Sequence, residues 1–257
     1  IKDNIQLSFS TNVKESNMEQ EEISKKALSN YSNSSPWPKD DAWHSYTYSY
    51  IKKSTEQWLS ICSRPGMKIL NAGSGGTEYK TNGTTIHLDI VEQYICHFND
   101  YLIGSIEKIA LSNTSVDGIV CVGSVLNYAD AQRAIFEFQR ILKPGGFLIL
   151  EFERSESAEF LWTKQHGKYI FSKEYCYNHQ AHLLWLYSEK HIRQLLNNYN
   201  FKIEKCKRFH SISSLLYRMG VEEQKAASFS KLDRVLNVFS YPLAHNVMFL
   251  AKKIPSK

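Results

Sequence analysis

Two strand-like runs, separated by a glycine-rich turn, constrain the fold of this chain most. MKILNA (67–72) leads into the turn GSGG (73–76), and the later run TTIHLDI (84–90) carries Asp89 near its end. A turn without side chains lets backbone N–H groups approach a ligand, and a carboxylate at the tip of the next strand can accept both hydroxyls of a ribose. The arrangement predicts a site for an adenosine-type ligand.

The turn differs from the glycine loops of other nucleotide sites. It reads G-x-G-x-T and not the G-x-G-x-x-G of dinucleotide folds, and no G-x-x-x-x-G-K-[ST] motif occurs in the chain. Because the loop contains no Lys or Arg, an uncharged linker to the adenosine suits it better than a pyrophosphate.

Strand-like and helix-like segments alternate after this turn. A buried strand is expected at 117–124, a helix at 130–142, and another strand at 147–152 after the stop KPGG (143–146). Alternation of this kind predicts a parallel sheet covered by helices on both faces.

The last third of the chain continues this pattern and adds a cover. Ser188 can cap a helix, and strands are expected at 201–209 and 244–253. Residues 210–243 lie between those two strands and are helical in pattern, so we expect them to form a helical insertion over the site.

Composition and the properties of individual segments limit the domain organisation and the location of the protein. We expect residues 1–62 to form an N-terminal helical cap and linker ahead of a main domain over 63–257. No run of about 18 apolar residues occurs, so no membrane span is predicted. The five cysteines are odd in number, widely scattered and without CxxC spacing, which argues against a disulfide framework and a metal site. A cytoplasmic location is therefore expected.

Five segments, in this order, resemble the motifs of class I S-adenosylmethionine-dependent methyltransferases. They are ILNAGSGGT (69–77), HLDI (87–90), GSIEKIAL (104–111), DGIVCVGSVLNY (117–128) and RILKPGGFLILEF (140–152). The resemblance implies an α/β fold with a Rossmann-like, doubly wound sheet of seven strands, an N-terminal helical cap and a helical insertion before the last strand. It also implies S-adenosylmethionine as cofactor and S-adenosylhomocysteine as product.

The resemblance assigns cofactor contacts to residues of these segments. The methionine portion, the ribose, the adenine and the surroundings of the sulfonium would be contacted by Asn71, Gly73, Ser74, Gly75, Asp89, Ile90, Ser105, Ile106, Val122, Gly123 and Ser124. Core packing is the competing interpretation for Ile90, Ile106 and Val122. The family usually carries an acid where Asn71 stands and often Asp where Ser105 stands, but both uncharged side chains can still accept hydrogen bonds.

A sulfonium methyl group is already activated, so such an enzyme mainly aligns a nucleophile, excludes water and, where needed, removes a proton. We predict His210 and Tyr128 as the catalytic residues, with His44, His166 and Glu153 as further candidates. Each histidine has a more common alternative role, as a surface or packed imidazole.

The methyl acceptor is the least determined feature. We expect methyl transfer to O or N of a small molecule, because the segments that flank the site can enclose it. Residues 189–218 carry five more basic than acidic side chains, which form either a solvated face or a rim that attracts an anionic acceptor. That surplus also motivates an RNA methyltransferase as an alternative, although the overall net charge is only +5 and no NPPY-type signature follows the strand at 117–124. A non-catalytic, cofactor-binding regulatory subunit is a third interpretation, suggested by Asn71 and Ser105.

Overall fold

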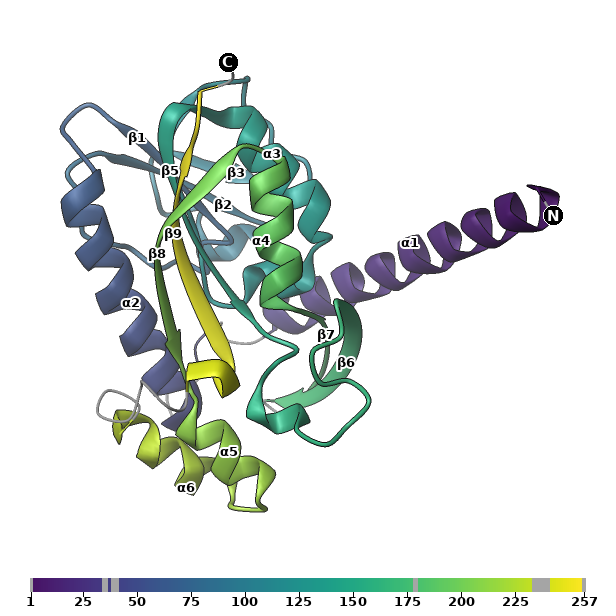
Figure 1. The fold of residues 1–257 in the computed structure, drawn as a ribbon. Helices are drawn as coiled ribbons and strands as arrows, with labels where there is room; N and C mark the ends of the chain where they lie inside the picture. Colours follow the sequence, from purple (N-terminus) through teal and green to yellow (C-terminus); the bar gives the residue numbers. More distant parts are fainter. Residues whose placement is uncertain (1, 34–36, 38–41, 178–179, 233–240, 256–257) are drawn as a thin grey trace.

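A seven-stranded sheet forms the centre of the molecule, in the strand order β3-β2-β1-β4-β5-β9-β8 (Figure 1). The computed structural model describes residues 2–33, 37, 42–177, 180–232 and 241–255. The strands are β1 Lys68–Ala72, β2 Thr84–Asp89, β3 Tyr101–Ile103, β4 Val116–Cys121, β5 Leu142–Glu153, β6 Ile170–Tyr177, β7 Gln180–Tyr187, β8 Phe201–Phe209 and β9 Asn246–Lys253. The α-helices are α1 Lys2–Ser32, α2 Ala42–Cys62, α3 Ala131–Ile141, α4 Glu189–Asn198, α5 Ile212–Arg218 and α6 Glu223–Ser228.

Strand direction divides the sheet into two parts. β3, β2, β1, β4 and β5 pair in parallel, whereas β9 runs antiparallel to both of its neighbours, β5 and β8. The carboxyl ends of β1, β2, β4 and β5 consequently meet at one edge, which is where ligands bind in open parallel sheets. The predicted Rossmann-like sheet of seven strands is confirmed.

Helices cover both faces of the sheet because its strands are apolar on both sides. In β1, Leu70 packs into the core that includes α3 and α4, while its neighbour Ile69 faces the opposite core with Ile51, Trp58 and Leu59 of α2. Figure 1 shows α2 on one side of the sheet and α3 with α4 on the other. The sequence predicts α2 as part of an N-terminal cap over residues 1–62. In the structure α2 packs directly on the sheet and forms one of the layers of the main body.

Two covering segments lie near the carboxyl edge. The β6–β7 hairpin, which the sequence analysis missed, packs against the second half of α1. The predicted insertion before the last strand contains α5, α6 and the short 3₁₀ helices Phe229–Leu232 and Tyr241–Leu243, and its residues 233–240 lie outside the described part. Together these segments position side chains over the sheet edge.

Candidate functional site

The glycine turn after β1 is held directly against the end of β2. The N–H groups of Gly73 and Ser74 both donate to the carbonyl oxygen of Leu88, at 2.8 and 2.9 Å. Gly73 has a φ of +72°, and a Cβ at this position would lie 2.4 Å from two carbons of Val125. Both the conformation and the close approach require glycine here.

Asp89 joins the glycine turn to the same end of β2. Its Oδ2 accepts the N–H of Gly75 at 2.7 Å, and its Oδ1 accepts the N–H of Val91 at 2.9 Å. The two oxygens of a carboxylate offer about four lone-pair sites together, so the group can accept more than these two hydrogen bonds. Burial raises the pKa of Asp89, an effect that backbone hydrogen bonds from Gly75, Val91 and Ile90 oppose. The carboxylate is thus fixed in orientation with acceptor capacity left over.

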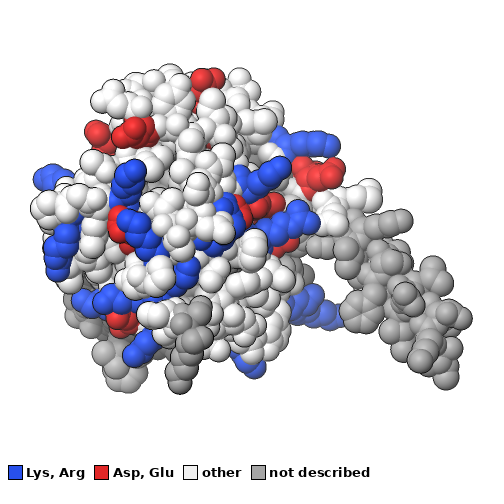
Figure 2. All heavy atoms as spheres, turned by 90° about the horizontal axis from the view of Figure 1, so that it is seen from above, with Lys and Arg blue, Asp and Glu red and all other residues white. Residues whose placement is uncertain are grey.

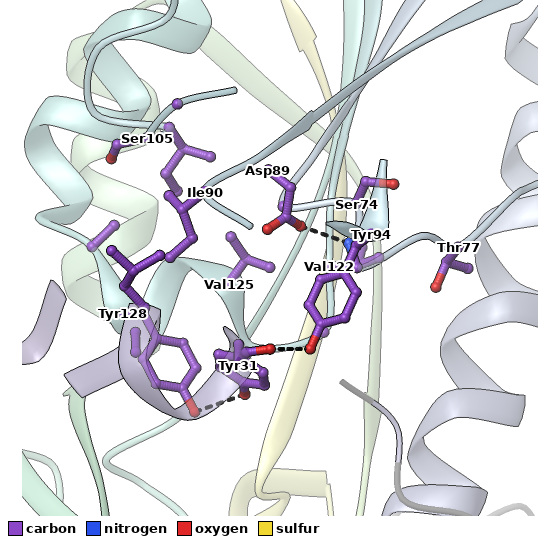
Figure 3. Close-up of a pocket in the computed structure, with 18 of the residues that line it drawn as sticks. Tyr31, Ser74, Thr77, Asp89, Ile90, Tyr94, Ser105, Val122, Val125 and Tyr128 are labelled. Carbon is purple, nitrogen blue, oxygen red and sulfur yellow. Dashed lines mark hydrogen bonds between the residues drawn. The ribbon is translucent and has the colours of Figure 1, made fainter. Parts of the chain in front are cut away.

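A first cavity of about 270 Å³ lies between this turn and the second half of α1. Figure 3 shows Asp89, Ile90 and Ser105 around it, with Val122 and Val125 from the chain that follows β4. The predicted cofactor-binding residues that line it are Gly73, Ser74, Gly75, Asp89, Ile90, Ser105, Ile106, Val122 and Gly123. Nine of the eleven residues predicted to contact the cofactor thus come together in the lining of one cavity.

Asn71 lies beneath the first cavity and does not line it. Its side chain is buried, with 3% of its surface exposed. Nδ2 donates to the carbonyl oxygen of Thr77 at 2.8 Å and to Oγ of Ser74 at 3.3 Å. The amide thus closes the glycine turn from below, so the structure gives Asn71 a positioning role instead of the predicted cofactor contact.

A buried carboxylate supports the turn after β4. Gly123 and Ser124 have φ angles of +85° and +57°, and both donate N–H hydrogen bonds to Oε2 of Glu151, at 2.8 and 2.7 Å. Nδ2 of Asn246 donates to the other oxygen at 2.8 Å. Burial raises the pKa of Glu151 to about 7, although hydrogen bonds from Ser124, Asn246 and Gly123 lower it. Glu151 therefore holds the left-handed turn that borders the site.

A second cavity of about 360 Å³ adjoins the first. The two share Tyr31, Trp37, Gly123 and Tyr128 in their linings. Ser124, which was predicted near the sulfonium, lines the second cavity. The structure thus offers one cavity with the features of a nucleoside site and a neighbouring cavity for another molecule, with the turn after β4 between them.

Tyr128 is placed at the junction of the two cavities, whereas His210 is not. The Tyr128 hydroxyl lies 3.0 Å from the hydroxyl of Tyr31 and 3.1 Å from Nδ1 of His182. Burial lowers the pKa of His182 to about 4, so its ring is neutral at pH 7. Of the further candidates, His44 and Glu153 also line the second cavity.

His210 lies outside the linings of both cavities. Its ring is fully buried and stacks on Trp43, with centroids 4.0 Å apart. Nε2 lies 2.8 Å from Oγ1 of Thr47, and Nδ1 lies 2.8 Å from Oγ of Ser213. Because both ring nitrogens have partners inside a packed region, the geometry does not support the catalytic role predicted for His210. His166 is exposed and also lies outside both linings.

The sequence analysis missed the contribution of α1 to the site. Ala27 and Tyr31 line the first cavity, and Ile23 and Ala27 are buried against the rest of the molecule. Tyr94 donates a hydrogen bond to the carbonyl oxygen of Tyr31 and so ties the end of α1 to the chain after β2 (Figure 3). The signal was present, because Ile23, Ala27 and Tyr31 recur at the four-residue spacing of one helix face.

None of the helices formed by the described residues has the length and apolar character needed to cross a bilayer. Within the same part of the chain, no three His, Cys, Asp or Glu side chains are grouped so that they could hold a metal ion.

Comparison with known proteins gives a family for the central region. Residues 72–150 match the family model of a methyltransferase domain. No curated protein matches the sequence.

Solved structures of methyltransferases share the fold at low sequence identity. A 1,6-didemethyltoxoflavin-N1-methyltransferase from Burkholderia thailandensis is 14% identical, with 83% of this chain and 84% of that chain covered and a TM-score of 0.51. A SAM-dependent methyltransferase from Methanosarcina mazei is 15% identical, with coverages of 77% and 98% and a TM-score of 0.52. A geranyl diphosphate C-methyltransferase from Streptomyces coelicolor is 10% identical, with coverages of 79% and 78% and a TM-score of 0.52.

Proposed function

We propose that this chain, whose residues 72–150 match the family model of a methyltransferase domain, is a class I S-adenosylmethionine-dependent methyltransferase that methylates O or N of a small molecule held in the second cavity. The observation that carries the proposal is the shared border of the two cavities, formed by Tyr31, Trp37, Gly123 and Tyr128. A methyl donor in the first cavity and an acceptor in the second would meet at this border.

The residues of the first cavity fit the cofactor of this enzyme class. Asp89 has unused acceptor capacity for the two ribose hydroxyls, and its own orientation is fixed by Gly75 and Val91. Ile90 and Ile106 offer apolar contact for adenine beside it, and Ser105 offers a hydroxyl. When bound, S-adenosylmethionine supplies an activated methyl group.

The protein's own contribution is alignment and exclusion of water. Tyr31 and Trp37, from the N-terminal part of the chain, line both cavities at their border. Tyr128 presents its hydroxyl at the same border. Glu153 also lines the second cavity and presents a carboxylate to the acceptor there. Enclosure of this kind suits a small acceptor better than a polymer.

The basic surplus of residues 189–218 gives little support to an RNA substrate. None of its Lys or Arg side chains lines either cavity. Arg193 and Arg208 pair with Glu189, and Lys207 donates to Ser54 and Gln57. On the face shown in Figure 2, basic side chains outnumber acidic ones but are scattered among uncharged residues, several of them beside an acidic side chain.

Calorimetry on the purified chain tests the proposal. We expect S-adenosylmethionine and S-adenosylhomocysteine each to bind at one site. Absence of binding by both would overturn it. Methyl transfer by the single purified chain to any member of an amine and alcohol library would exclude the regulatory-subunit interpretation.

Substitution of Gly73 by alanine should weaken S-adenosylhomocysteine binding at least about tenfold, because alanine in a left-handed conformation costs roughly 1–2 kcal/mol and its Cβ would also overlap Val125. Calorimetry measures the affinity. Gly145→Ala is the matched control, since Gly145 has a φ of +78° but no atom within 4 Å of a Cβ there. The double variant Gly73→Ala/Val125→Ala should recover part of the affinity, and equal losses from Gly73→Ala and Gly145→Ala would contradict this account.

Replacement of Tyr128 by phenylalanine should lower the methyl-transfer rate about tenfold or more and leave S-adenosylhomocysteine affinity within about threefold. The variant keeps the ring but removes the hydroxyl that lies beside Tyr31 and His182. Tyr199→Phe, at the end of α4, is the control. A Tyr128 variant with an unchanged rate and weakened cofactor binding would show that the hydroxyl acts only in the first cavity.

A further inference from the structure

The geometry points to an acceptor that enters the second cavity with an amine, held by the carboxylate of Glu153 and by the side-chain oxygen of Asn246. This inference rests on the proposed function, because it names the class of molecule that the second cavity binds. It also departs from the anionic acceptor that the basic surplus of the sequence suggested.

Asn246 brings a hydrogen-bond acceptor with capacity left to the lining of the second cavity. Asn246 is buried, with 2% of its surface exposed. Its Nδ2 donates to Glu151, while its Oδ1 has no hydrogen-bond partner among the described residues. An unsatisfied buried oxygen is costly, so a ligand that donates a hydrogen bond to it would be favoured. A carboxylate or phosphate has no such donor.

Glu153 provides the charge beside this oxygen. It ends β5, and its Oε2 lies 3.3 Å from Nε2 of His245. Burial alone would raise the pKa of Glu153, but the hydrogen bond and the charge of His245 outweigh it and hold the pKa below its usual value. Glu153 is therefore ionised at neutral pH and can pair with an ammonium group.

The cationic groups of the same cavity are already compensated. His245 lies between Glu153 and Glu159, with Nδ1 3.6 Å from Oε2 of Glu159. Burial alone would lower the pKa of His245, but the two carboxylates outweigh it and raise the pKa. Lys173 donates to Glu159, and its ammonium lies 4.1 Å from the ring centroid of Tyr175. Both cations thus already have carboxylate partners, and Glu174 and Glu223 add two further carboxylates to the lining, so acidic side chains outnumber Lys173 and His245 there.

Aromatic rings supply the remaining walls. Tyr31, Trp37, Trp43, Tyr128, Tyr175 and Tyr217 line the second cavity. The faces of such rings attract cations and not anions. Carboxylate, amide oxygen and aromatic walls together form a site suited to an amine, next to the border with the first cavity.

A matched series of small probes tests the inference on the full chain saturated with S-adenosylhomocysteine. We expect benzylamine to bind at least about tenfold more tightly than benzoate and more tightly than benzyl alcohol, as measured by calorimetry. Equal or tighter binding of benzoate or benzyl alcohol would overturn the inference, and so would the absence of benzylamine binding up to about 10 mM.

Substitution of Glu153 tests whether this residue causes the preference for benzylamine. Glu153→Gln should reduce the benzylamine preference at least about fivefold with S-adenosylhomocysteine affinity within about twofold. Glu204→Gln, on β8 beside Lys252, is the matched control and should keep the preference. A Glu153→Gln protein that keeps the full preference would contradict the assignment, and the wild-type series decides alone should this variant not fold.

Different results would overturn the proposed function and the amine inference. Loss of the proposed function would appear as no binding of S-adenosylhomocysteine. Failure of the amine inference would appear as normal S-adenosylhomocysteine binding with no preference for the amine probe.

Discussion

Asp89→Ala should weaken S-adenosylhomocysteine binding by roughly 10²- to 10⁴-fold. Two ribose hydroxyls would each lose a hydrogen bond to a charged acceptor, and such bonds contribute roughly 1.5–3 kcal/mol each. The same substitution leaves the N–H groups of Gly75 and Val91 without their acceptor, so the glycine turn also loses its attachment to β2. Calorimetry gives the affinity, and thermal denaturation gives the accompanying loss of stability.

Asp117→Ala is the matched control for this experiment. Asp117 lies near the amino end of β4, where Oδ2 accepts the N–H of Lys68 at 2.9 Å and Oδ1 pairs with Lys143 at 2.8 Å. Its loss therefore also removes a backbone hydrogen bond, but at the opposite edge of the sheet. We expect unchanged cofactor affinity in this variant. A similar affinity loss in both variants would mean that Asp89 acts through general stability, not through the ribose.

The part of the site that follows from local chain chemistry was predictable. The turn at 73–76 requires glycine for its conformation. Asp89 ends β2, and β2 pairs in parallel with β1, the strand that leads into this turn. Because parallel neighbours end at the same edge, spacing along the sequence was enough to bring Gly75 and Asp89 together.

Residues that depend on tertiary packing were not predictable in the same way. His210 follows β8 and was expected to face the site, but Thr47 and Trp43 of α2 enclose its ring. The β6–β7 hairpin brings Lys173, Tyr175 and His182 to the second cavity, although nothing local in these residues indicates which cavity they reach. The partner of each side chain lies far away in the sequence, so periodicity alone could not identify it.

Glu151→Gln should remove a pH dependence of stability that the wild-type protein carries. The pKa of Glu151 rises from its ordinary value of 4.5 to about 7 on folding, because the side chain is buried. Between these values the folded protein keeps a proton that the unfolded chain has lost. The favourable contribution of Glu151 to the free energy of unfolding is therefore complete below pH 4.5. It falls by roughly 3 kcal/mol as the pH rises from 4.5 through 7, and above that range it is constant.

Glutamine can replace the carboxyl group without ionising. Its side-chain oxygen can accept the N–H groups of Gly123 and Ser124, and its amide can donate to Asn246 once that side chain turns its oxygen toward it. The free energy of unfolding of the variant, relative to wild type, should thus increase by roughly 3 kcal/mol between pH 4.5 and pH 8. Urea denaturation at a series of pH values measures this difference.

The comparison of the variant with wild type separates the effect of Glu151 from the effects of other buried carboxyl groups. Asp89 and Glu107 also have raised pKa values because of burial, but they are present in both proteins, so their effects largely cancel. Glu204→Gln, exposed on β8, should change stability by less than about 0.5 kcal/mol at every pH. A difference between Glu151→Gln and wild type that does not vary with pH would show that Glu151 is ionised throughout. The left-handed turn between the two cavities would then rest on a permanent buried charge and not on a carboxyl group that is protonated near neutrality.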